Sequence, residues 1–78
     1  MNQERRNIIN TQISALQDVE HALTDVAEAE QEAFDNMPEG LQNSARGEAT
    51  QEALNQLEEA LECIRSACDA LSEAMGGK

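Results

Sequence analysis

The residues best suited to chemistry are gathered in the middle of the chain, in the segment NMPEGLQNSARGEA at positions 36–49. The segment combines amide, hydroxyl and guanidinium side chains beside the expected start of a helix. Free backbone N–H groups at a helix N-terminus attract anions, and arginine binds phosphate through paired hydrogen bonds. We therefore expect an anion-binding site that is formed by Asn36, Asn43, Ser44, Arg46, Gly47 and Glu48.

A purely local explanation of the same residues remains open. Arg46 could pair with Glu48, with Asp35 or with a neighbouring helix, and the amide and hydroxyl groups could act only as helix caps. Two further arginines, Arg5 and Arg6, are expected at the opposite end of the hairpin. They could join the site only if subunits pack antiparallel, end to end.

The sequence argues against an enzyme. It has no phosphate-binding loop, no dinucleotide-binding glycine motif and no nucleophile elbow. The single histidine, His21, stands three residues after Asp18, whereas carboxylate-bridged metal bundles use Glu-x-x-His. We therefore expect no catalytic residues, no metal and no cofactor.

The two cysteines, Cys63 and Cys68, are expected to stay unpaired. At about 100° per residue on one helix they point about 140° apart, so they cannot form a disulfide there. Cys68 fits a small core residue and Cys63 a flanking one. Unpaired cysteines and an N-terminus without an apolar export signal predict a cytoplasmic location.

Composition restricts how the chain can be stabilised. It has 78 residues, one phenylalanine and no tyrosine or tryptophan, so its core must be aliphatic. Chains of this size bury barely enough apolar surface to offset the entropy that they lose on folding. Because neither a disulfide nor a metal is expected, self-association is the predicted source of stability.

The net charge of −11 comes from 16 acidic and 5 basic residues. This charge disfavours direct binding to nucleic acid or to an anionic membrane surface. No apolar run is long enough to span a membrane. The charge either keeps the helix surfaces solvated or imitates a nucleic-acid backbone, and the acidic cluster of Glu28, Glu32 and Asp35 motivates the second possibility.

Two helical patterns flank the central segment, at residues 3–35 and 45–75. In the first, apolar residues recur at steps of three and four, which predicts a helix that buries one stripe. In the second, the steps alternate strictly, which is typical of a coiled-coil seam. Alanines beside that seam would let another helix approach closely. The first stripe is Ile9, Ile13, Leu16, Val19, Leu23 and Val26; the second is Leu54, Leu57, Leu61, Ile64, Cys68, Leu71 and Met75; the alanines are Ala53, Ala60, Ala67 and Ala74.

The chain is expected to reverse direction in a junction at residues 36–44, because Pro38 cannot continue a helix. We therefore predict an all-α fold: a two-helix antiparallel hairpin, one domain over residues 1–78, that self-associates into a helical bundle. Leu41 is expected to tuck under the hairpin end, and Gly76 to form a left-handed cap after the second helix. Asn43 or Ser44 is expected to cap the second helix at its start.

The junction resembles that of a family of small acidic helical proteins encoded by bacteriophages and prophages. The shared pattern is NMPE-x-L-x-x-S-x-R-G-E, which lies between a variable first helix and a repetitive second one. The resemblance implies a phage accessory protein that works in the cytoplasm of a bacterial host. The matching residues are Asn36, Met37, Pro38, Glu39, Leu41, Ser44, Arg46, Gly47 and Glu48.

Three functions fit these observations. The favoured one is an oligomeric sponge that sequesters a small anionic nucleotide, an immune signal of the host, and so counters antiphage defence. The first alternative is an acidic mimic of nucleic acid that inhibits a DNA-binding protein. The second is a structural helical oligomer that scaffolds or assembles virion parts. The sponge is favoured because it alone uses the long junction.

Overall fold

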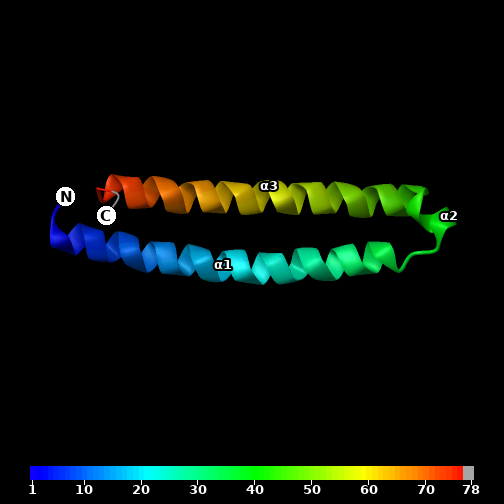
Figure 1. Ribbon diagram of the computed structural model, residues 1–78, viewed down its shortest axis with the longest axis horizontal. Coiled ribbons are helices and arrows are strands. Elements are labelled where there is room, and N and C mark those ends of the chain that lie inside the picture. The colour runs from blue at the N-terminus through cyan, green and yellow to red at the C-terminus, as the bar shows by residue number, and fades with distance from the viewer. Residues whose placement is uncertain (77–78) are drawn as a thin grey trace.

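Two long antiparallel helices, joined through a short third one, make up the computed structural model, which describes residues 1–76 (Figure 1). Helix α1 spans Gln3–Asp35, α2 spans Glu39–Gln42 and α3 spans Ala45–Ala74. The rod measures 58 × 15 × 15 Å. The all-α hairpin that the sequence predicts is confirmed, with the junction between residues 35 and 45.

Local signals in the sequence set the outer helix ends. Asn2 caps α1 because its side-chain oxygen accepts a hydrogen bond of 2.8 Å from the Arg5 N–H. After α3, the Met75 N–H donates to the carbonyl groups of the last turn, and Gly76 adopts a φ of 103°. This is the left-handed cap expected from the sequence, and glycine adopts it without a steric cost.

The helices pack through one seam of residues on each, which we call the inner seam. Its members recur at alternating steps of three and four, the spacing of a coiled coil. All of them are buried or half-buried. The inner seam comprises Ile9, Ile13, Leu16, Glu20, Leu23, Ala27, Glu30 and Phe34 on α1, and Gly47, Thr50, Leu54, Leu57, Leu61, Ile64, Cys68, Leu71 and Met75 on α3.

The predicted stripe is confirmed on α3 and partly wrong on α1. Val19 and Val26 are 45% and 51% exposed, and Glu20 and Ala27 occupy the inner seam in their place. The alternating period requires positions 20 and 27 to face α3. A glutamate can lie at that seam because Arg65 pairs with it.

The hairpin buries few side chains completely. Leu61 is 2% exposed and Ala27 is 9% exposed, and they are the buried hydrophobic residues among positions 1–76. The other apolar members of the inner seam are half-buried. In this described range, no helix combines the length and the apolar character that crossing a membrane requires.

Candidate functional site

The junction is a compact structure held by backbone hydrogen bonds. The Met37 N–H donates to the Phe34 carbonyl at 3.1 Å as α1 ends, and Pro38 directly precedes α2. The Pro38 carbonyl then accepts from the Leu41 and Gln42 N–H groups at 2.8 and 3.1 Å. The expectation for Leu41 is wrong: its side chain is 42% exposed, because the inner face of α2 is occupied by backbone that lies against α3.

Gly47 is the residue of α3 against which the backbone of α2 packs. A Cβ atom at this position would lie 2.1 Å from the Gln42 carbonyl oxygen and 2.6 Å from the Leu41 carbonyl oxygen. Contacts this short with backbone atoms are not allowed, so only glycine lets α2 lie against the first turn of α3. Gly47, predicted as a ligand-binding residue, is buried and has a packing role at this junction.

The polar side chains at the end of α2 bond to that helix. The Ser44 hydroxyl donates to the Leu41 carbonyl, and the Asn43 amide donates to the Glu39 carbonyl at 3.4 Å. Ser44 occupies the N-cap position of α3, but its side chain makes no capping hydrogen bond there. The expectation that Asn43 or Ser44 caps α3 is therefore confirmed for the position, which Ser44 holds, and wrong for the side-chain hydrogen bond, which is absent.

The first turn of α3 consequently keeps free donors. The Glu48 N–H bonds to the Ser44 carbonyl at 3.0 Å, whereas no protein acceptor is found for the Ala45 and Arg46 N–H groups within residues 1–76. Arg46 and Glu48 are exposed, and neither side chain forms an ion pair within that range. The local pairing of Arg46 with Glu48 or Asp35 is absent from the described hairpin.

Asn36 belongs to the end of α1, whereas the other predicted site residues follow α2. It is the C-cap of α1, where its N–H donates to the Glu32 carbonyl at 3.0 Å, and its side chain is exposed. The other five residues are contiguous with the end of α2 and the start of α3. Arg5 and Arg6 lie at the far end of the 58 Å rod, so they cannot reach Arg46 within one chain (Figure 1).

An open groove of about 420 Å³ lies between the long helices, and no residue of the junction lines it. Ala27, Leu54 and Leu61 contribute its apolar lining, and Glu28, Glu58 and Arg65 contribute charged groups. The space exists because Ala27 puts only a methyl group on the inner seam. Sequence reasoning missed this groove, although Ala27, which lies between Leu23 and Glu30 on the inner seam, was a signal for it.

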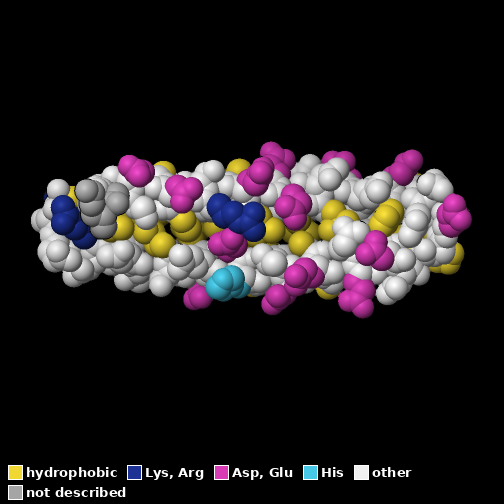
Figure 2. Space-filling view, viewed as in Figure 1, with side chains coloured by type: hydrophobic (Ala, Val, Ile, Leu, Met, Phe, Trp, Pro, Cys, Tyr) yellow, Lys and Arg dark blue, Asp and Glu magenta, His cyan; other side chains and the backbone are white. Residues whose placement is uncertain are grey.

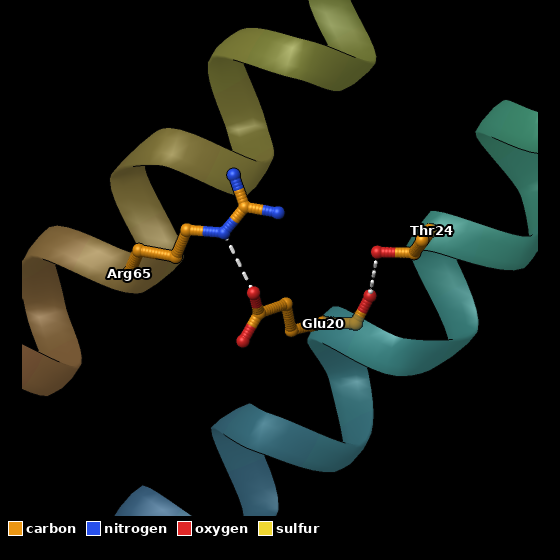
Figure 3. A network of polar contacts seen from close by, with 3 residues as sticks. All are labelled: Glu20, Thr24 and Arg65. Carbon is orange, nitrogen blue, oxygen red and sulfur yellow. Dashed lines mark hydrogen bonds and ion pairs between the residues drawn. The ribbon is translucent and has the colours of Figure 1, made fainter.

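Arg65 and Glu20 join the two helices at one edge of this groove. The Arg65 Nε donates to a Glu20 carboxylate oxygen at 2.7 Å, and the Thr24 hydroxyl donates to the Glu20 carbonyl at 2.8 Å (Figure 3). The hydrogen bond from Arg65 to Glu20 raises the pKa of Arg65 above its ordinary value.

We expect this ion pair to fix helix register rather than to supply much stability. The Arg65 side chain is 52% exposed, and exposed ion pairs contribute little. A double-mutant cycle with Glu20→Gln and Arg65→Gln, followed by urea unfolding, should give a small coupling energy. That energy should fall further at about 1 M salt, where the Debye length is about 3 Å. A large coupling that salt does not change would contradict this expectation.

The described residues contain no group of three or more His, Cys, Asp or Glu side chains that could hold a metal ion. The acidic residues are instead spread along the rod, as Figure 2 shows for one face. Comparison of the chain with protein-family models, with curated proteins and with solved structures gives no match.

Proposed function

We propose that the chain is a non-enzymatic accessory protein of a bacteriophage or prophage, an oligomeric sponge for a nucleotide signal of the host's immune system. By holding that nucleotide, the protein would counter antiphage defence. One observation carries the proposal: the Arg46 side chain is exposed beside a helix N-terminus and forms no ion pair within residues 1–76. The chain has 16 acidic residues, yet none of those described pairs with this arginine.

The start of α3 has the chemistry of a phosphate site. No side chain caps the start of α3 within residues 1–76, and the Ala45 and Arg46 N–H groups keep their hydrogen-bonding capacity. The helix dipole adds a positive partial charge at the same place. A phosphate group can accept from these N–H groups while the Arg46 guanidinium binds it through paired hydrogen bonds.

The neighbouring groups suit the remainder of a nucleotide. The Glu48 carboxylate can accept hydrogen bonds from ribose hydroxyl groups, and the side-chain amides of Asn36 and Asn43 can donate to and accept from a base. Gly47 serves the site indirectly, because its packing against α2 fixes the angle at which these side chains are presented. A single exposed junction encloses no ligand, so we place the complete pocket where junctions of several subunits meet.

Titration calorimetry with cyclic nucleotides and ADP-ribose derivatives tests this function. We expect at least one of them to bind the wild-type oligomer, and Arg46→Ala to weaken that binding by roughly tenfold or more, since a charged hydrogen bond is lost. Arg65→Ala is the matched control: it removes the same charge from the same helix, far from the junction, and should bind as wild type. The absence of heat with every compound, from protein shown to be oligomeric, would refute the proposal.

A further inference from the structure

The residues that directly precede the inner seam form a second series on each long helix, which we call the outer seam. It has the same alternating spacing and contains no charged residue between positions 8 and 33 or between 49 and 74. Two glutamines, Gln12 and Gln56, are its most polar members there. The outer seam comprises Ile8, Gln12, Ala15, Val19, Ala22, Val26, Ala29 and Ala33 on α1, and Ala49, Ala53, Gln56, Ala60, Cys63, Ala67, Ala70 and Ala74 on α3.

The two outer seams lie on the same side of the hairpin. Each outer position is one residue, or about 100° of rotation, before an inner position that faces the other long helix. Because α1 and α3 run in opposite directions, this rotation leads to the same side on both helices (Figure 1). The outer seams therefore form one continuous face, which we call the apolar face.

The opposite side of the hairpin has the reverse character. The residues that directly follow the inner seam are polar or charged, and they include His21, Glu28, Glu58, Glu62 and Arg65. Figure 2 shows a side of the hairpin on which acidic, basic and histidine side chains flank the line of hydrophobic side chains between the two helices. Between positions 8 and 33 and between 49 and 74, charged side chains thus lie on this side, on the outer edges or, as Glu20 and Glu30, on the inner seam, and none lies on the apolar face.

The apolar face is open to solvent in a single hairpin. Ile8, Val19 and Val26 are 55%, 45% and 51% exposed, and seven of the eight α3 members are exposed, all except the half-buried Ala53. The outer seams span 25 residue steps on each helix, about 38 Å at 1.5 Å per residue, so on a rod 15 Å wide the apolar face covers roughly 600 Å² in projection. Accessible surface exceeds projected area, so this face is comparable in size with the roughly 800 Å² that each partner buries in a stable protein dimer.

We propose that a second copy of this chain covers the apolar face with its own apolar face, so that two hairpins form a four-helix bundle. Two chains of charge −11 repel each other, and this side alone lets them meet without placing carboxylates against carboxylates. The alanines allow close helix approach, while Val19 and Val26 supply the larger side chains of the new core. Because the two surfaces are identical, a two-fold symmetric pair is self-complementary and closed.

This pairing supplies the oligomer that the proposed function requires, and its test needs no nucleotide. In Ala60→Glu/Ala67→Glu, two carboxylates enter the middle of the apolar face without loss of helix propensity. The control Ser66→Glu/Ser72→Glu adds the same charge to the same helix outside that face. We expect the dissociation constant, from analytical ultracentrifugation, to rise more than about a hundredfold in the first variant and little in the second.

Three outcomes would overturn the pairing: a folded wild-type monomer at about 100 µM, two variants that both remain dimers, or two variants that both dissociate. Nucleotide binding by an oligomer that Ala60→Glu/Ala67→Glu still forms would overturn the pairing and leave the proposed function in place. A dimer that binds no nucleotide would do the reverse. The two ideas can therefore fail separately.

The reactivity of the Cys63 thiol provides a second measurement, made on the wild-type chain. Cys63 is exposed in the hairpin and lies near the middle of the apolar face, whereas Cys68 lies on the inner seam. We expect alkylation of Cys63, followed by peptide mass spectrometry, to slow at least roughly tenfold as the protein concentration is raised through the dimerisation range. An unchanged rate in protein that sediments as a dimer would place the interface elsewhere and overturn the proposal.

Discussion

Replacement of Gly47 by alanine is expected to lower the free energy of unfolding by about 3 kcal/mol, although alanine is the better helix former. The added Cβ would lie 2.1 Å from the Gln42 carbonyl oxygen and 2.5 Å from the Gln42 carbonyl carbon. Both are backbone atoms, so no side-chain rotation can relieve the overlap. The chain must move α2 away from α3 and give up the backbone packing between them.

The matched control for this substitution is Gly40→Ala. Gly40 lies within α2, and a Cβ there would meet no atom within 4 Å. This change should raise stability by roughly 0.5–1 kcal/mol, because alanine loses less backbone entropy in a helix than glycine. Urea unfolding of both variants, followed by circular dichroism at equal protein concentration, should give changes of opposite sign. Equal stability of the two variants would show that Gly47 does not limit the approach of α2.

Gly47 also shows which part of the junction the sequence could predict. Pro38 marks the end of α1 from its own chemistry, because it has no N–H group and excludes the preceding turn of a helix. The burial of Gly47 depends on how closely α2 approaches α3, and no property of residues 44–49 alone encodes that distance. The exposure of Leu41 has the same origin, since α2 turns its backbone toward Gly47.

The two inner seams differ in how readily they can be found from the sequence. On α3, leucines and other apolar residues occupy seven consecutive seam positions from 54 to 75, so the period is visible directly. On α1, the seam contains Glu20 and Glu30, and the more hydrophobic Val19 lies one residue away. Hydrophobicity alone therefore assigns Val19, rather than Glu20, to the inner seam. The correct phase requires knowing that Arg65 lies opposite Glu20, which is a property of the paired helices.

The misassigned valines matter for the pairing proposed above. If Val19 and Val26 belonged to the inner seam, the hairpin would have one apolar stripe per helix and no apolar face. Their exposure, together with the alanines of α3, is what gives the hairpin a second packing surface. The candidate anion site was easier to locate, because five of its six residues are neighbours in the chain and reach the junction together.

Replacement of Leu61 by alanine should have the other large effect. Leu61 is 2% exposed, the lowest value among the buried hydrophobic residues, and it lies at the middle of α3 opposite the groove that Ala27 leaves open. Removing its side chain loses the transfer free energy of three carbons and enlarges that groove, at a cost of about 3 kcal/mol. For a chain of this size the melting temperature should fall by roughly 15 °C.

The control for this loss is Leu41→Ala, the same chemical change on a side chain that is 42% exposed. It should cost less than about 1 kcal/mol, because little apolar surface returns to water. Thermal unfolding of both variants should be measured at the same protein concentration, because the melting temperature of an oligomer depends on concentration. Similar melting temperatures for the two would mean that the chain has no core around Leu61, and the inner seam described here would have to be rejected. A large drop confined to Leu61→Ala would instead locate the centre of hairpin stability at the part of the inner seam where Leu61 lines the groove beside Ala27.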